Sequence, residues 1–250
     1  MGHSIGKAKW LLLPVLGGLL LAGAGVVTFS DFFAVKTMDI YGKVTLSPQD
    51  VMENAPQLAI GKNIFLSDVK GAKKAISAIP QIADVKIYRR LPDRIEIMIK
   101  EHQPKVLLML DKIYGISDNK VLVGFSDPFQ IPNLPIITGL EGTVEAETYT
   151  KIHSAKLDSL WEFIVTMDRI TPSMEDRISE LCWDDTYGAV LYLTSDGIKV
   201  IVGRENYVKR VQKLKAIMGT IQPTRTNIAR LDLRFSGQVV MRYKHSKKRT

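Results

Sequence analysis

The stretch "VKIYRRLPDRIEIMIKE", from Val85 to Glu101, carries the pattern that decides the fold class of its region. Apolar and polar side chains alternate on both sides of Pro92–Asp93, and they place Ile95, Ile97 and Ile99 on one face. This period-two alternation is typical of strands with one buried face. Because Pro followed by Asp favours a turn, the stretch predicts a β-hairpin with a basic corner.

The residues before the hairpin predict one more strand and two helices. Residues 34–42 alternate as a strand does, and Ser47–Pro48 is a capping signal for a short helix that runs to about Leu58 or ends earlier at Pro56. Ser67 or Asp68 caps a second helix, which Pro80 closes. The order β-α-α-β-β predicts a compact α+β module over residues 34–102, in which two helices cover one face of an antiparallel sheet.

A second region, residues 103–242, predicts a mostly antiparallel β domain with two helices. The expected elements are short strands within 105–125, a helix in 145–169, a hairpin in 180–203, a helix in 205–219, and two closing strands around Ser236–Gly237. No internal repeat interrupts this order, so the chain is expected to hold one copy of each unit.

The N-terminal segment predicts a membrane anchor. Residues 11–29 contain no charged side chain, and at 1.5 Å per residue they span roughly 28 Å, about the thickness of a bilayer core. Lys7 and Lys9 precede the segment, so we expect residues 1–9 in the cytoplasm, a single transmembrane helix at 10–30, and the rest outside the cytoplasm. Ala22-Gly23-Ala24 resembles a signal-peptide cleavage site, which is the alternative; it also places the bulk of the chain outside.

The charge distribution argues against a nucleic-acid-binding protein. The formal net charge is +8, but much of it lies at the two ends of the chain. Residues 242–250 alone hold five basic side chains and no acid, and we expect residues 243–250 to form a disordered basic tail. The nearly neutral body lacks the basic face that phosphates require.

The residue pattern predicts neither an enzyme nor a cofactor or metal site. None of the four histidines is paired with another His, a Cys or a carboxylate at ligand spacing, and Cys182 reads as a small buried apolar residue. Asp184 and Asp185 are adjacent in a predicted strand and so point to opposite faces. We therefore expect no small-molecule substrate.

Several motifs occur in an order that resembles one protein family. The most specific is "PQIADVKIYRRLPDRIEIMIKEHQP" at 80–104. The others are "VKTMDIYG", "LSPQDV", "GKNIFLSD", "GISDNKVLV", "LPIITG", "LTSDGIKVIVGR" and "ARLDLRFSGQVVMR". Together they resemble the FtsQ/DivIB family of bacterial cell-division proteins, with three departures: Lys120 replaces a glycine, Phe235 replaces the usual tyrosine, and the loop at Ser236–Gly237 is short.

The resemblance implies a function as well as a fold. It implies that residues 34–102 form a POTRA domain and 103–242 the family's β domain. It also implies a non-enzymatic, single-pass scaffold of the divisome, located in the inner membrane at the division septum. Its partners would be late division proteins, notably FtsB-like and FtsL-like bitopic proteins. A partner strand would pair beside the last strands, at Arg234, Phe235, Ser236, Gly237, Gln238, Val239, Val240 and Met241.

The residues themselves are compatible with this mechanism. A terminal strand with unpaired backbone groups is a template for an added strand, and Arg234 would supply a charged contact to an acid on the partner. In the hairpin, we expect Arg89, Arg90, Asp93 and Arg94 to be free for a secondary partner contact. Two alternatives are a POTRA-bearing component of outer-membrane protein assembly or secretion, and an envelope enzyme acting on peptidoglycan.

Overall fold

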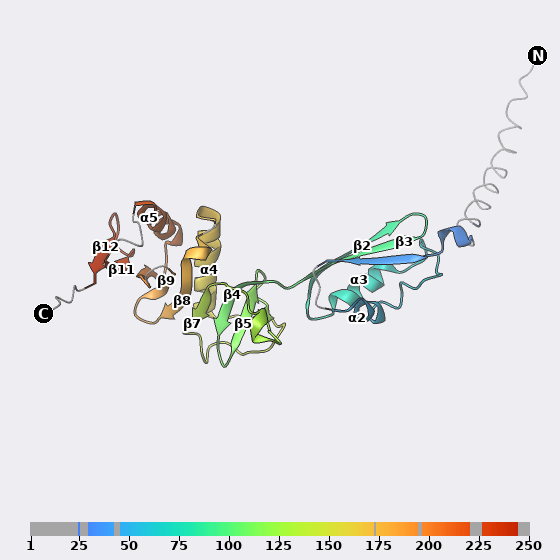
Figure 1. The fold of residues 1–250 in the computed structure, drawn as a ribbon, viewed down its shortest axis with the longest axis horizontal. Coiled ribbons are helices and arrows are strands. Elements are labelled where there is room, and N and C mark those ends of the chain that lie inside the picture. Colours follow the sequence, from blue (N-terminus) through green and yellow to red (C-terminus); the bar gives the residue numbers. More distant parts are fainter. Residues whose placement is uncertain are drawn as a thin grey trace, which may run out of the picture. The chain divides into compact units, whose positions relative to one another are not determined.

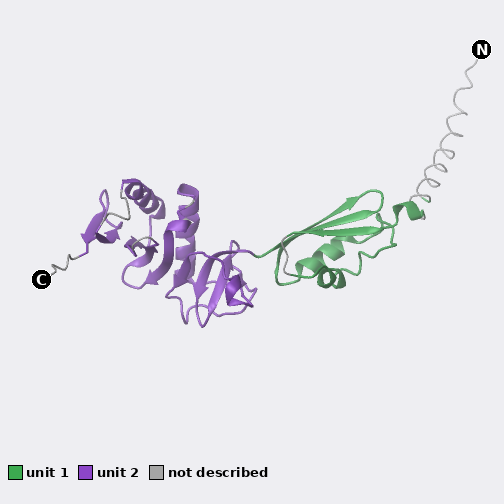
Figure 2. Ribbon diagram, in the orientation of Figure 1, with its two compact units in different colours: residues 1–102 green, residues 103–250 purple. Residues whose placement is uncertain are grey.

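The computed structural model describes residues 25, 30–42, 46–172, 174–194, 197–220 and 227–244. The predicted cytoplasmic residues 1–9, nearly all of the predicted anchor at 10–30, and most of the predicted tail at 243–250 lie outside these ranges. Within them, the helices are all too short or too polar to cross a bilayer. The chain divides into two compact units, Met1–His102 and Gln103–Thr250 (Figure 2).

The first unit holds a three-stranded sheet with its helices on one face (Figure 1). Its elements are η1 (Asp31–Phe33), β1 (Thr37–Tyr41), α2 (Pro48–Glu53), α3 (Val69–Ser77), β2 (Ile82–Arg90) and β3 (Arg94–Glu101). The strand order is β1-β3-β2, with β2–β3 antiparallel and β1–β3 parallel. The expected wholly antiparallel sheet is therefore wrong. β1 runs in the direction opposite to β2. Because β2 and β3 are antiparallel, β1 is parallel to β3, the strand beside it.

Local capping explains where the two helices of this unit begin. At α2, the Ser47 hydroxyl accepts a hydrogen bond from the Asp50 amide, and the Asp50 carboxylate accepts one from the Ser47 amide, both at 3.2 Å. The helix stops at Glu53, short of the predicted Leu58, because Pro56 disfavours helical backbone in the residue before it. At α3 the cap is Asp68, whose carboxylate accepts from the Gly71 amide at 2.9 Å.

The hairpin prediction is confirmed by the burial of its side chains. Ile95, Ile97 and Ile99 of β3 and Val85 of β2 are buried against the helices, and the intervening side chains point outward. The core they form also includes Val35, Val51, Ala55, Leu58, Ile64, Ala72 and Ile76. Burying one of the larger aliphatic side chains contributes about 1.5–3 kcal/mol to folding. Because a shift of one residue would turn these side chains toward solvent, the alternation fixes the register of the sheet.

The second unit is built on one nine-stranded sheet. Its elements are β4 (Pro104–Met109), β5 (Ile113–Ser117), β6 (Leu122–Val123), η2 (Pro128–Gln130), β7 (Ile136–Thr138), α4 (Ala155–Ile170), η3 (Glu175–Arg177), β8 (Ile178–Asp184), β9 (Gly188–Leu193), β10 (Lys199–Gly203), α5 (Tyr207–Thr220), β11 (Ile228–Asp232) and β12 (Val240–Tyr243). The strand order is β12-β11-β10-β9-β8-β7-β4-β5-β6. Antiparallel pairs predominate, as expected; the parallel ones are β4–β7, β7–β8 and β10–β11.

Helices α4 and α5 pack on each other and on one face of this sheet (Figure 1). Phe163 of α4 and Tyr207 of α5 meet edge to face, with ring centroids 5.7 Å apart, and the Tyr207 hydroxyl lies 2.5 Å from that of Ser159. α4 begins at Ala155, ten residues after the expected region starts, because residues 145–154 form a loop that bridges to Val121 through Lys151. From β8 to β12 the opposite face of the sheet carries polar side chains, among them Lys199, Arg230 and Arg242, around buried Val190 and Ile201.

Candidate functional site

The last strand of the sheet, β12, lies at an open edge. Within the described residues its one neighbouring strand is β11, with which it pairs antiparallel. All four of its residues, Val240 to Tyr243, are exposed. A strand paired on one side presents backbone N–H and C=O groups on the other, and these are available to an added strand.

The loop between β11 and β12 is held by a lysine from α5. Gly237 has a φ of +73°, which a glycine adopts without strain, and this turns the chain back toward β11. The Lys213 ammonium donates to the carbonyl oxygens of Leu233 and Gln238, both at 3.4 Å, and also to that of Phe235. One cation thus binds three backbone carbonyls and fixes the path of the chain into β12.

Arg234 is not the free cation that the sequence predicted. Its guanidinium donates to both carboxylate oxygens of buried Asp232, at 3.0 and 2.8 Å, and it stacks 4.9 Å from the ring centroid of Tyr187. Gly203, with a φ of +105°, makes room for the arginine, because a Cβ there would lie 3.1 Å from Arg234 Cγ. Arg234 therefore makes contacts within the chain that stabilise the edge of the sheet.

The ionisation of Asp232 follows from this pair. Burial disfavours its charged form, but the hydrogen bonds from the Arg234 side chain and backbone outweigh burial, so the pKa of Asp232 lies below its ordinary value. The hydrogen bond to Asp232 likewise raises the pKa of Arg234. Both groups are charged at neutral pH, and the ion pair is bidentate, the strong geometry for arginine and carboxylate.

A row of cations crosses the polar face of the sheet next to this edge. Arg242 of β12 lies opposite Arg230 of β11, and Arg230 lies opposite Lys199 of β10. Residues paired across strands point to the same face, so the three cations form a basic row. Like charges directly opposite each other are unfavourable, so an anionic group placed on this row would relieve the repulsion.

Comparison with known proteins identifies the family to which the two units belong. Residues 33–102 match the POTRA domain of the FtsQ type, and residues 111–234 match the family described as "Cell division protein FtsQ/DivIB, C-terminal". The chain belongs to the FtsQ/DivIB family.

Relatives from distant bacteria match most of the chain. The cell division protein FtsQ of Neisseria meningitidis is 26% identical over 94% of this chain and 93% of its own length. The FtsQ protein of Syntrophotalea carbinolica is 25% identical over 83% of this chain and 76% of its own. The DivIB protein of Clostridium botulinum is 32% identical, but over 37% of this chain and 36% of its own. All three relatives are named as cell division proteins.

In this FtsQ/DivIB chain each hairpin side chain has a partner within the unit, and a secondary partner contact there stays a prediction. Arg89 donates to the carbonyls of Ile64 and Ser67, both at 2.8 Å, and ties down the loop before α3. Arg90 pairs with Glu96 at 2.7 Å, Asp93 with Lys36 at 3.3 Å, and Arg94 with Asp39 at 3.5 Å. These contacts hold the POTRA unit together.

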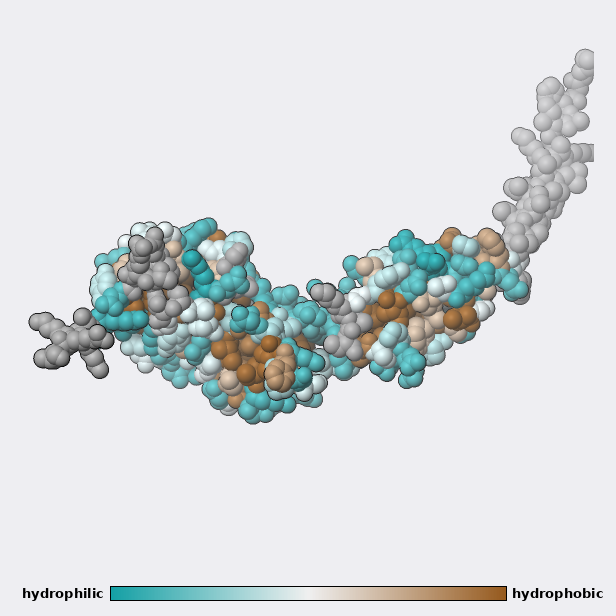
Figure 3. Space-filling model, viewed as in Figure 1, coloured by the Kyte–Doolittle hydropathy of each residue, from teal (hydrophilic) through white to brown (hydrophobic). Residues whose placement is uncertain are grey.

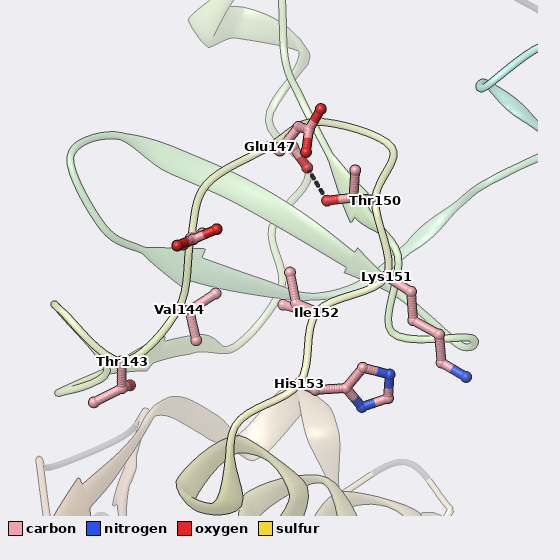
Figure 4. A pocket seen from close by; sticks show the side chains of 8 residues that line it. Thr143, Val144, Glu147, Thr150, Lys151, Ile152 and His153 are labelled. Atoms are coloured by element: carbon pink, nitrogen blue, oxygen red, sulfur yellow. Dashed lines mark hydrogen bonds between the residues drawn. The ribbon is translucent and has the colours of Figure 1, made fainter.

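The hollow in Figure 4 does not assemble a catalytic group. It has a volume of about 450 Å³ and is lined by the loop Thr143–His153. Glu147 and His153 lie at opposite sides of it, and the Thr150 hydroxyl donates to the Glu147 carbonyl at 2.5 Å (Figure 4). In the part of the chain that the structure describes, no three His, Cys, Asp or Glu side chains gather as metal ligands do.

The structure also adds functional residues that the sequence pattern did not single out. Lys213, Lys199, Arg230 and Asp232 all contribute to the edge, but they come from two strands and a helix. The alternation of Arg230, Asp232 and Arg234 was a usable signal, since it places all three on one face of a strand. Cys182 is half-buried on this polar face rather than fully buried, and burial raises the pKa of its thiol.

Proposed function

We propose that this FtsQ/DivIB member is a single-pass membrane scaffold of the divisome, and that it captures a partner by strand addition beside β12. The observation that carries the proposal is the open edge of β12, which has one neighbouring strand among the described residues and four exposed side chains. An extended partner segment would complete its backbone hydrogen bonds there, and its side chains would supply specificity.

Side chains on both faces of β12 would contact the added strand. Val240 and Arg242 lie on the polar face, and Met241 and Tyr243 on the other. Phe235, 45% exposed in the preceding loop, offers an apolar contact at one end, next to Ser236, Gly237, Gln238 and Val239. The basic row of Arg242, Arg230 and Lys199 favours an acidic residue on the partner, which is the role that the sequence had given to Arg234.

The partners and location that we propose follow from the family. We infer that residues 103–242 bind FtsB-like and FtsL-like bitopic division proteins at the septum. Residues 10–30 would form the inner-membrane anchor, with residues 1–9 in the cytoplasm and the POTRA domain at 34–102 outside it. The proposed contact surface does not include the hairpin side chains, because each has an internal partner.

The alternative roles have less support. A component of outer-membrane protein assembly or secretion would share the POTRA fold, but the match of residues 111–234 to the FtsQ/DivIB C-terminal family favours cell division. A peptidoglycan enzyme would need a nucleophile with a base or a pair of carboxylates, and the edge described above is a surface for binding, without such a group.

A proline scan of β12 tests strand addition. Proline is tolerated in an edge strand only where the lost N–H faces away from the neighbouring strand. At the alternate positions among 240–243 whose N–H points away from β11, proline should abolish capture of an FtsB-like partner by the full-length chain. These variants should keep the unfolding temperature of the wild type. The intervening positions should lose both capture and stability. Alanine at the same four positions, which keeps the backbone N–H, is the matched control. Unchanged capture by all four variants would refute the mechanism.

A further inference from the structure

The N-terminal end of the POTRA unit is built from three segments joined by hydrogen bonds. The Ile64 amide donates to the Phe33 carbonyl at 2.8 Å, and the Lys36 amide donates to the Asp93 carbonyl at 2.8 Å. The Arg89 guanidinium adds its bonds to the loop at 64–67. Figure 1 shows η1 and the β2–β3 turn at the same end of the unit. The segments 31–36, 61–67 and 89–93 therefore form one rigid surface, here called the apolar end.

This surface exposes four large apolar side chains. Phe32 is 61% exposed, Phe65 44%, Leu66 68% and Leu91 60%. Half-buried Phe33 connects two of them, with its ring centroid 5.0 Å from that of Phe32 and 5.3 Å from that of Phe65. Figure 3 shows brown and tan surface on this part of the unit. Exposed apolar side chains gathered on one small surface mark a binding face, whereas single scattered ones do not.

The short chain distance between the uncharged segment and Phe32 indicates what this face contacts. Phe32 follows the last residue of the uncharged segment 11–29 by three positions, which is at most about 11 Å of extended chain. The headgroup layer on each side of a bilayer is roughly 5–8 Å thick. If residues 11–29 span the membrane, Phe32 is confined to the headgroup layer or its immediate surface, where aromatic side chains are favoured.

We propose that the apolar end rests in the headgroup layer of the membrane, with Phe32, Phe65, Leu66 and Leu91 as its lipid contacts. The proposal depends on the anchor that is part of the proposed function, but not on the partner strand. The three segments carry cations at Lys36, Lys62, Arg89 and Arg90 and acids at Asp31 and Asp93. Asp93 pairs with Lys36 and Arg90 pairs with Glu96, so apolar contact rather than attraction to anionic lipid drives insertion.

Site-directed spin labelling of the full-length chain in phosphatidylcholine nanodiscs tests this placement. With Cys182→Ser as background, a nitroxide is attached at Leu66→Cys. The matched control is Ala78→Cys, an exposed position after α3 at the opposite end of the sheet, near the start of β2. Collision rates are measured with oxygen, which concentrates among acyl chains, and with a water-soluble nickel complex. We expect the oxygen-to-nickel ratio at position 66 to exceed that at 78 severalfold, also at high salt.

Further results would show whether the lipid contact or the anchor is at fault. Equal ratios at positions 66 and 78 would overturn the proposal, and so would a label at 66 that is shielded from both reagents, because protein would then cover it. A chain released from the discs by alkaline carbonate would show that the anchor has failed instead. Phe65→Ser, an exposed substitution, should lower the ratio of a label at Leu91→Cys while leaving the circular dichroism unchanged; an unchanged ratio would also count against the surface.

Discussion

Among the described residues, basic side chains gather on the β2–β3 hairpin of the POTRA unit and at the β11–β12 edge of the second unit, and the two sets are held in different ways. Arg89, Arg90 and Arg94 each have a carbonyl or a carboxylate as partner. At the edge, Arg230 faces Arg242 and Lys199 instead. The first arrangement stabilises a fold, whereas the second places three cations side by side on a surface where an anionic partner can bind.

Arg234 shows that the two uses also occur side by side. It lies two residues from Asp232 and is neutralised by it, while Arg230, two residues before Asp232, lies in the basic row. Whether a cation stabilises the fold or can bind a partner therefore depends on the group that lies opposite it in the folded sheet. The predictions below test this distinction, starting with the largest effect.

The largest effect is expected for Asp232→Ala. Removing one member of a buried ion pair leaves the other without its partner, which typically costs 3–5 kcal/mol; because Arg234 is about one-third exposed, we expect about 2–3 kcal/mol. Urea unfolding monitored by tryptophan fluorescence measures it. The control is Asp185→Asn, which removes an exposed pair with Lys156 and should leave the midpoint unchanged. Equal effects of the two substitutions would show that Asp232 is not structural.

The same pair predicts a pH dependence. The pKa of Asp232 is lower in the folded chain than in the unfolded one, so the unfolded state binds the proton more tightly. Its stabilising contribution is complete above about pH 4, the ordinary range for Asp, and is lost as the pH falls through the lower folded value. The difference in unfolding free energy between wild type and Asp232→Ala should therefore shrink at acid pH.

A smaller effect is expected at the hairpin. Arg89→Ala removes two hydrogen bonds to backbone carbonyls and should lower the stability of the POTRA unit by about 1–2 kcal/mol, with no effect on partner capture. Arg94→Ala removes an exposed pair and should cost no more than about 0.5 kcal/mol. Calorimetry of both variants with a capture assay separates the two roles. If either variant lost partner capture but kept its stability, the hairpin would be part of the partner-binding surface.

A small change in stability of the opposite sign is expected for Arg242→Glu. It replaces a like-charge pair across β11 and β12 with an attractive one and should stabilise the edge by about 0.2–1 kcal/mol. Capture of a partner with an acidic segment should nevertheless weaken, and the weakening should diminish as salt screens the charges. Arg242→Gln is the matched neutral control. Stronger capture by Arg242→Glu would show that the basic row does not face an acid.

The hairpin and the helix caps were predictable because their signals are local. The alternation of Ile95, Ile97 and Ile99 specifies a buried face, and Ser47 with Asp50 specifies a helix start. The parallel β1–β3 pair and the late start of α4 were missed, since both depend on segments that are distant in sequence. The basic row escaped for the same reason: Lys199 and Arg230 become neighbours only through the register of β10 and β11.

The strands of the candidate site were predictable from the sequence, but the contacts of its side chains were not. Residues 234–241 do lead into the open edge, as the motif implied. The sequence did not reveal that Arg234 is bound by Asp232, or that Lys213 holds the loop from a helix that precedes it by about twenty residues. Both are contacts of the folded state, and burial of Asp232 is what makes its pair with Arg234 geometrically specific.

Hydrogen exchange of the β12 amides, with and without the partner, tests the central claim most directly. The full-length chain is compared free and bound to an FtsB-like extracytoplasmic segment. Strand addition predicts that alternate amides among residues 240–243, which exchange rapidly in the free chain, become protected on binding, while those already paired with β11 change little. Partner binding with unchanged exchange across β12, and new protection on another surface, would contradict the account.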